Sequence, residues 1–172
     1  LGFLVNSGNM DSMVNHYTAG KKPRSTDAYT PGGKAGKRPD RAVIVYANRI
    51  REAYSRMPVI IGGIEASLRR FAHYDYWDDK VRRSVLVDSG ADLLLYGMGE
   101  RSIVEVADAL DAGIPVREIT YVAGSACLMS EPPEDAQVLP SFDAVKSDPE
   151  AYCRAFMAQH TEADPIRGKR LA

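Results

Sequence analysis

Short apolar runs separated by amphipathic segments constrain the fold of this chain more than any other feature. Residues 1–5, 59–61 and 92–96 have the length and the apolar character of buried strands. Residues 40–57 and 100–112 repeat apolar side chains at spacings of three and four, the period of a helix with one buried face. This alternation predicts βαβ units, and therefore an open, mostly parallel α/β sheet with helices on both faces.

Weaker signals complete the predicted order of elements. Residues 65–71 are expected to form a helix after a pair of glycines. Residues 80–89 fit either a strand or a helix, and a helix that ends at Gly90 agrees better with the alternation. Two further runs are weaker strand candidates, at residues 119–122 and 126–129.

The carboxyl-terminal part of the chain differs in composition. Half of the ten prolines follow residue 130. Ser147-Asp-Pro-Glu150 has the pattern of a capping box with proline in the first turn of a helix. We therefore predict a Rossmann-like domain over residues 1–130 and a proline-rich, partly helical extension over residues 131–172. Because the chain starts inside an apolar run and without Met, we also expect it to be a piece of a longer protein.

Composition excludes several classes of protein. The 172 residues are 45% hydrophobic with a net charge of −1, which fits one globular domain better than a disordered or fibrous chain. No apolar run approaches the ~18–20 residues of a membrane helix, so we expect no membrane partner. Cys127 and Cys153 form no CxxC pair and no ligand cluster. They predict reduced thiols in a cytoplasmic protein and no metal site.

Residues 6–39 form a long segment without clear periodicity, and such segments are often functional or disordered. Between residues 21 and 41, seven Lys or Arg residues stand against two Asp. This excess suggests contact with an anion such as RNA, with Tyr17 and Tyr29 available for stacking. A solvated loop is the simpler interpretation. The basic residues are Lys21, Lys22, Arg24, Lys34, Lys37, Arg38 and Arg41.

Two glycine pairs follow predicted strands, at the edge where open parallel sheets bind ligands. Glycine lets the backbone approach a ligand, and the helix that follows offers free N–H groups. The residues predicted to form a pocket for a polar ligand or cofactor are Gly62, Gly63, Glu65, Gly97, Gly99 and Glu100. The alternative is two tight turns in which both glutamates only stabilise a helix dipole. The residues alone favour this alternative. Dinucleotide and P-loop spacings are absent, which disfavours NAD and a nucleotide phosphate.

His73 lies in the densest group of aromatic and titratable residues, which continues as a predicted loop over residues 74–79. A neighbouring carboxylate can orient an imidazole for binding, so His73 is included among the candidate cofactor-binding residues. A packed aromatic loop with surface carboxylates is the somewhat simpler interpretation. His16 and His160 are isolated in the sequence, and no arrangement for nucleophilic catalysis is present. No catalytic residue is therefore assigned.

Several long motifs resemble the amino-terminal region of the YgiQ-type radical S-adenosylmethionine proteins, and together they cover nearly the whole chain. These motifs are residues 10–15, 27–33, 36–40, 62–70, 72–77 and 81–88. More loosely, the glycine pairs at 62–63 and 97–99 resemble the cobalamin-binding domain that precedes the barrel in many radical S-adenosylmethionine enzymes.

The resemblance implies a flavodoxin-like, cobalamin-binding-like domain attached to a downstream radical S-adenosylmethionine barrel. In such families a CxxxCxxC motif on the barrel holds a [4Fe–4S] cluster and leaves one iron open for S-adenosylmethionine. Cys127 and Cys153 do not supply this motif, so cluster and radical chemistry belong to the rest of the protein. Residues 6–11 also lack the histidine of an Asp-x-His-x-x-Gly cobalamin loop, and cobalamin binding without that ligand stays open.

Three functions remain as hypotheses. The first is an amino-terminal domain of a radical S-adenosylmethionine enzyme of unknown substrate, which grips substrate or cofactor and helps to close the active site. The second is an RNA-binding module that uses residues 21–41. The third is a purely structural domain that shields the barrel.

Overall fold

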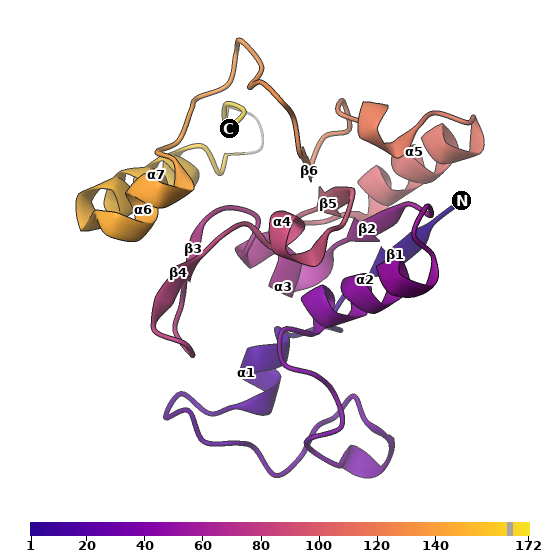
Figure 1. Ribbon diagram of the computed structural model, residues 1–172, viewed down its shortest axis with the longest axis vertical. Coiled ribbons are helices and arrows are strands. Elements are labelled where there is room, and N and C mark those ends of the chain that lie inside the picture. Colours follow the sequence, from indigo (N-terminus) through magenta and orange to yellow (C-terminus); the bar gives the residue numbers. More distant parts are fainter. Residues whose placement is uncertain (165–166) are drawn as a thin grey trace. The chain divides into compact units, whose positions relative to one another are not determined.

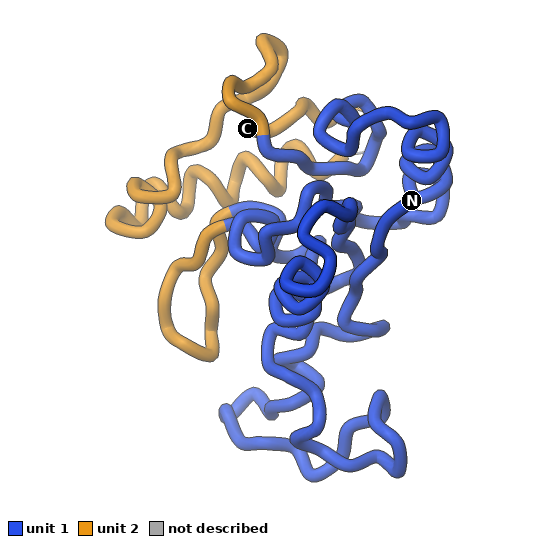
Figure 2. Tube along the Cα trace, turned by 45° about the vertical axis from the view of Figure 1, so that its right-hand side comes forward, with its two compact units in different colours: residues 1–71, 84–128 blue, residues 72–83, 129–172 orange. Residues whose placement is uncertain are grey.

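The computed structural model describes residues 1–164 and 167–172, which divide into two compact units (Figure 2). The first unit consists of residues 1–71 and 84–128, and its helices and strands are β1 (Phe3–Val5), α1 (Ser12–His16), α2 (Ala42–Ala53), β2 (Val59–Ile61), α3 (Gly63–Leu68), α4 (Val85–Ser89), β5 (Leu93–Leu95), α5 (Glu100–Asp111) and β6 (Ser125–Cys127). Two short 3-10 helices, Pro31–Gly33 and Val116–Glu118, belong to the same unit. The second unit consists of residues 72–83 and 129–172 and contains β3 (His73–Asp75), β4 (Lys80–Arg82), α6 (Phe142–Ser147) and α7 (Pro149–Thr161).

The first unit is built on a four-stranded sheet in the order β1-β2-β5-β6 (Figure 1). Strands β1, β2 and β5 are parallel, and β6 is antiparallel to β5. The predicted α/β class and the mostly parallel sheet are therefore confirmed. The flavodoxin-like strand order is not confirmed, because that order places the first strand between its two successors. Here β1 lies at the edge of the described sheet and β2 takes the position between β1 and β5.

Helices cover both faces of the sheet, as predicted, because side chains along each strand alternate between the faces. On one face, Val59, Ile61 and Leu94 share a buried core with residues of α2 and α4. On the other face, Ile60 and Leu93 pack with buried residues of α5. Each central strand therefore consists of apolar residues throughout. This is why the continuous apolar runs in the sequence predicted these strands.

Two of the weaker element predictions need correction. Within residues 80–89, only the second half is helical: α4 begins after Ser84, whose Oγ accepts a hydrogen bond from the Leu86 amide, and ends at Gly90 in the left-handed region. The first half is β4. Residues 119–122 form no strand, because the chain turns through Val116–Glu118 and enters the sheet only at β6.

The predicted aromatic loop at 74–79 is largely a β-hairpin in the second unit. Strands β3 and β4 pair antiparallel, with His73 opposite Arg82 and Asp75 opposite Lys80. The buried Asp75 carboxylate accepts the Trp77 amide at 3.0 Å and forms an ion pair with Arg82. Side-chain bonds across the turn thus stabilise strands that carry few apolar residues.

The second unit also contains the two helices of the carboxyl-terminal segment, α6 and α7. Pro149 occupies the first turn of α7, as predicted, but the N-cap is Asp148, which accepts the Glu150 amide at 2.9 Å and the Ala151 amide at 3.2 Å. Ser147 is instead the last residue of α6, and its Oγ donates to the Asp143 carbonyl of that helix at 2.7 Å. The division into a domain over 1–130 and a linker over 131–172 stays a prediction. Among the described residues, none of the helices has the length and apolar character needed to cross a membrane.

Candidate functional site

The loops that follow the three parallel strands meet at one edge of the sheet, as predicted for a parallel sheet. We call this edge, formed by residues 6–11, 62–68 and 96–99, the carboxyl rim. The Ser12 amide, at the start of α1 directly after the first loop, donates to Glu65 Oε2 of α3 at 2.8 Å. The Gly97 amide donates to Ser67 Oγ at 3.2 Å, which joins α3 to the loop after β5. The predicted glycine pairs are therefore brought together.

Glu65 has a structural role that its position in the first turn of α3 did not reveal. The residue is 1% exposed. Its Oε2 accepts the Ser12 amide and its Oε1 accepts the Val43 amide at 3.1 Å, so one carboxylate serves the N-termini of α1 and α2. The Ser12 hydroxyl in turn accepts the Ala42 amide at 3.0 Å. These bonds replace the capping side chain that α2 lacks at Arg41. The predicted part of Glu65 in ligand binding stays a prediction.

The glycines of the rim allow close approach of backbone segments. A Cβ atom on Gly62 would lie 3.3 Å from the Leu95 carbonyl oxygen, tighter than ordinary contact. Gly63 has φ +78°, and a Cβ there would lie 3.2 Å from the Asn6 side chain. These glycines are required for packing between the loops, whether or not a ligand is bound.

The other predicted site residues are Gly97, Gly99, Glu100 and His73. Gly97 and Gly99 flank Met98, which is 87% exposed, and Glu100 is exposed in the first turn of α5. His73 belongs to the second unit, where it pairs with Arg82 across the hairpin. A ligand-binding role for each of these residues stays a prediction.

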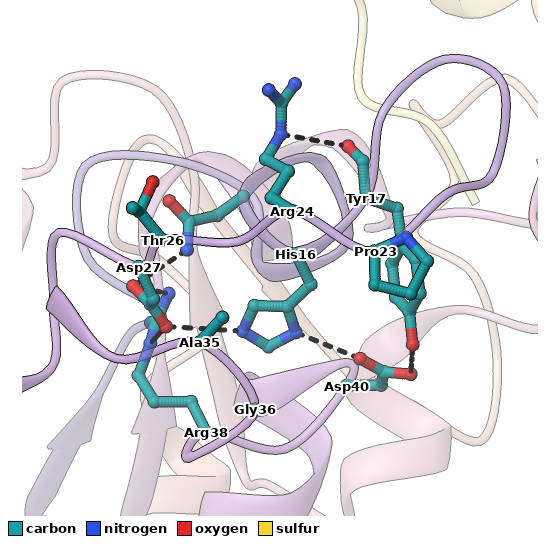
Figure 3. Close-up of a pocket in the computed structure, with 11 residues that line it drawn as sticks. His16, Tyr17, Pro23, Arg24, Thr26, Asp27, Ala35, Gly36, Arg38 and Asp40 are labelled. Atoms are coloured by element: carbon teal, nitrogen blue, oxygen red, sulfur yellow. Dashed lines mark hydrogen bonds and ion pairs between the residues drawn. The ribbon is translucent and has the colours of Figure 1, made fainter.

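A second site lies in the long segment before α2, where a pocket of about 520 Å³ opens beside the end of α1 (Figure 3). The segment was predicted to lack regular structure, yet it contains α1 and a 3-10 turn. The residues that line the pocket are Asn15, His16, Tyr17, Pro23, Arg24, Thr26, Asp27, Ala35, Gly36, Arg38 and Asp40.

Asp27 organises one wall of this pocket. It is 1% exposed and accepts hydrogen bonds from Asn15 Nδ2 at 2.8 Å, the Tyr29 amide at 2.9 Å and Arg38 Nε at 2.7 Å. The hydrogen bond from Arg38 is the main cause that lowers the pKa of Asp27 to about 2, against the opposing effect of burial. Arg38 also donates to the Ser7 carbonyl at 3.0 Å, which ties the pocket to the loop after β1.

The imidazole of His16 lies between two carboxylates of this pocket, those of Asp27 and Asp40 (Figure 3). Its Nδ1 is 2.9 Å from Asp40 Oδ1, and its Nε2 is 3.6 Å from Asp27 Oδ2. The Tyr17 hydroxyl donates to Asp40 Oδ2 at 2.8 Å, and this hydrogen bond is the main cause that raises the pKa of Tyr17. The arrangement holds the imidazole at a fixed orientation inside the pocket.

Sequence reasoning missed this pocket, because it treated His16 as isolated. Two signals pointed to it: the unusual length of the segment, and the motifs at 27–33 and 36–40, which begin and end with Asp27 and Asp40.

The contacts around the pocket also weaken the RNA hypothesis. Arg38 points inward to Asp27, the Tyr17 hydroxyl is bonded to Asp40, and the Tyr29 ring lies 4.7 Å from the Arg38 guanidinium.

The residues present do not fit an iron–sulfur cluster. A [4Fe–4S] cluster of this kind needs three thiolates on one motif. The chain has two cysteines, and Cys127 and Cys153 lie in different compact units. Within residues 1–164 and 167–172, no group of three or more His, Cys, Asp or Glu residues is arranged to hold a metal ion.

Comparison with known proteins shows where the chain belongs. The family described as Radical SAM N-terminal matches residues 1–172. A UPF0313 protein of Clostridium perfringens (strain ATCC 13124) is 60% identical over 99% of this chain, and the chain covers 26% of that protein. A UPF0313 protein of Clostridium botulinum (strain 657) is 58% identical over 99% of this chain, with 27% of the relative covered. No solved structure matches. The chain thus spans about a quarter of the length of these relatives, and the predicted resemblance is confirmed: the chain belongs to the Radical SAM N-terminal family.

Proposed function

We propose that this chain is the amino-terminal domain of a radical S-adenosylmethionine enzyme whose downstream part carries the [4Fe–4S] cluster and S-adenosylmethionine. In this proposal the carboxyl rim packs against the downstream domain and helps to close the active site. Family membership and the greater length of the relatives support the proposal. The general position of ligand sites in open parallel sheets supports the choice of this edge. Because Cys127 and Cys153 are both free thiols, we also propose that the protein is cytoplasmic.

The observation that carries the proposal is the set of exposed apolar side chains on the rim. Ile64 and Leu68 are one turn apart on α3, and they are 44% and 62% exposed. Met10 and Met98, in the loops on either side, are also exposed. Clustered apolar side chains on a surface mark an interaction site. We therefore assign the rest of the same protein as the partner that covers them.

Polar contacts beneath these side chains hold the rim in one shape. Asp11 caps α1 by accepting the Met13 amide at 2.9 Å and forms an ion pair with Arg69 at the end of α3. Glu65 and Ser67 make the connections already described to α1 and to Gly97. A surface fixed in this way loses little conformational freedom when it docks.

The chain's own part in the reaction follows from these residues. The cluster and S-adenosylmethionine, when bound, supply radical chemistry. The apolar side chains of the rim exclude water from the junction, and the loops position their backbone amides at its edge. Cobalamin and RNA are not included in the proposal, since no contact among residues 1–164 and 167–172 favours either.

The proposal is tested in the full-length protein after reconstitution with iron and sulfide. Leu68→Asp places a charge on the rim, and Val104→Asp places one on exposed α5 as a matched control. We expect Leu68→Asp to lose its iron–sulfur absorbance in air several-fold faster than wild type, and Val104→Asp to match wild type. Equal rates for all three proteins would contradict a closing role. A full-length protein that binds no cluster would contradict the enzyme class itself.

A further inference from the structure

Strand β1 lies at the edge of the sheet without the features that usually protect an edge strand (Figure 1). Among the described residues, β1 pairs with β2 alone, so one side of its backbone has no neighbouring strand. Exposed edges are usually protected by charged side chains, proline or a bulge. The β1 sequence Phe3-Leu-Val5 contains no charged residue and no proline, and its register with β2 is continuous. Such an apolar edge is a template for pairing with a further strand.

The hydrogen bonds of β1 show which of its backbone groups are available to that strand. The Phe3 amide donates to the Pro58 carbonyl at 2.8 Å. The Val5 carbonyl accepts the Gly62 amide at 2.9 Å. Phe3 and Val5 therefore direct their backbone groups toward β2. Because successive residues of a strand direct these groups to opposite sides, the amide and carbonyl of Leu4 face the open edge.

The side chain of Leu4 also lacks cover on its face of the sheet. Leu4 is level with Ile60 in the register, so both side chains lie on the face where Ile60 packs with residues of α5. Ile60 is 2% exposed, whereas Leu4 is 58% exposed. In parallel sheets the helices that connect the strands cover both faces. A further parallel strand, with its connecting helix, would bury Leu4 as α5 buries Ile60.

We propose that the open edge of β1 pairs with a parallel strand from a segment of the same protein outside these 172 residues, and that the helix connected to this strand covers Leu4. The relatives are long enough to supply such a segment, since the chain covers 26% of one and 27% of another. The parallel direction continues that of β1, β2 and β5. A second copy of the chain fits less well, because a two-fold axis pairs two identical edge strands antiparallel. This surface is separate from the carboxyl rim, and the proposal does not depend on the packing of the rim.

Hydrogen exchange of the wild-type full-length protein tests the pairing without any substitution. Mass spectrometry with single-residue fragmentation compares the amide of Leu4 with that of Phe3, which is bonded to Pro58. We expect the two amides, corrected for their intrinsic rates, to exchange within about ten-fold of each other, because both open only with the sheet. A Leu4 amide that exchanges more than about ten-fold faster would show that the edge is open and would overturn the proposal.

Photo-cross-linking of the full-length protein identifies the partner. Benzoylphenylalanine replaces Leu4 or Asn6, both exposed and on one face of the strand direction, and replaces Val104 on α5 as a matched control. We expect positions 4 and 6 to link to one apolar peptide outside residues 1–172, within a single polypeptide, and position 104 not to reach that peptide. The number of the linked residue should rise from position 4 to position 6.

The other outcomes each contradict a stated part of the proposal. A linked residue number that falls from position 4 to position 6 would overturn the parallel direction. A covalent dimer linked through residues 1–172 would make a second copy the occupant. Links from position 104 to the same peptide would show contact without specific pairing. If a variant fails to fold, the exchange measurement still decides whether the edge is paired, since it uses the wild-type protein.

Discussion

At the scale of single residues, the buried carboxylate of Glu65 caps two helices, a role that usually requires a separate N-cap side chain for each helix. Glu65 accepts the amides of Ser12 and Val43, and so connects α3 with the starts of α1 and α2. A carboxylate can accept at both oxygens, whereas an amide side chain can accept at one oxygen only. The identity of this residue as glutamate, and not merely its polarity, is therefore required.

Glu65→Gln is expected to destabilise the protein by about 1–3 kcal/mol, because it leaves one buried amide facing an NH2 group. The amides of Ser12 or Val43 should also exchange hydrogen faster, since one of them loses its acceptor. Hydrogen exchange followed by mass spectrometry measures both effects. The matched control is Glu100→Gln, which changes an exposed glutamate in the first turn of α5 and should stay within ~0.5 kcal/mol of wild type. Equal effects of the two substitutions would contradict the capping role.

Asp27 makes the stability of the pocket depend on pH in the acid range. Its pKa is lowered from 3.8 to about 2, so its contribution is complete above pH 3.8 and is lost as the pH falls through about 2. At ~1.4 kcal/mol per pKa unit, this contribution is about 2 kcal/mol. We expect the difference in unfolding free energy between wild type and Asp27→Asn to shrink by that amount between pH 4 and pH 2 in urea titrations. A difference that is constant with pH would contradict the lowered pKa.

At the scale of helices and strands, the sequence predicts best where burial is two-sided. Strand β2 coincides with the predicted run at 59–61, because a strand covered by helices on both faces must be apolar throughout. Strand β4 was missed, because its sequence Lys-Val-Arg has no such pattern and its pairing depends on the Asp75–Arg82 ion pair. Side-chain contacts of this kind have no signature in the periodicity of a sequence.

The exact first residue of a helix is also difficult to predict from sequence. Ser147 and Asp148 are both good N-cap residues, and sequence alone does not decide between them. The fold decides, because α6 extends through Ser147 and leaves Asp148 to cap α7. Helix boundaries inferred from pattern are therefore uncertain by one residue here, although the helix itself was predicted.

Asp148→Ala is expected to cost about 1 kcal/mol, because the amides of Glu150 and Ala151 lose their acceptor. Ser147→Ala, at the neighbouring position, should cost less than half as much, since the Ser147 hydroxyl only donates to a carbonyl within α6. Urea denaturation of both variants measures the difference. A larger loss for Ser147→Ala would restore the capping box inferred from the sequence.

At the scale of the whole molecule, topology explains which part of the site could be predicted. Parallel strands bring their carboxyl ends to one edge, so the gathering of residues 62–63 and 97–99 follows from the order of elements. The pocket around His16 does not follow from it. Its contacts join Asp27 and Asp40 to His16 across an irregular segment, and irregular backbone has no periodic signal.

The packing of the carboxyl rim against the rest of the protein is the central claim, and thiol labelling of full-length protein tests it most directly. Met98→Cys places a thiol where 87% of the side chain is exposed in this chain, and Val104→Cys places one at a 56% exposed position on α5. Maleimide labelling, located by mass spectrometry, compares the two positions. We predict that the thiol at 98 reacts at least ten-fold more slowly than the thiol at 104, because the downstream domain covers the rim. Faster labelling at 98, in the order of the exposed fractions, would contradict the account.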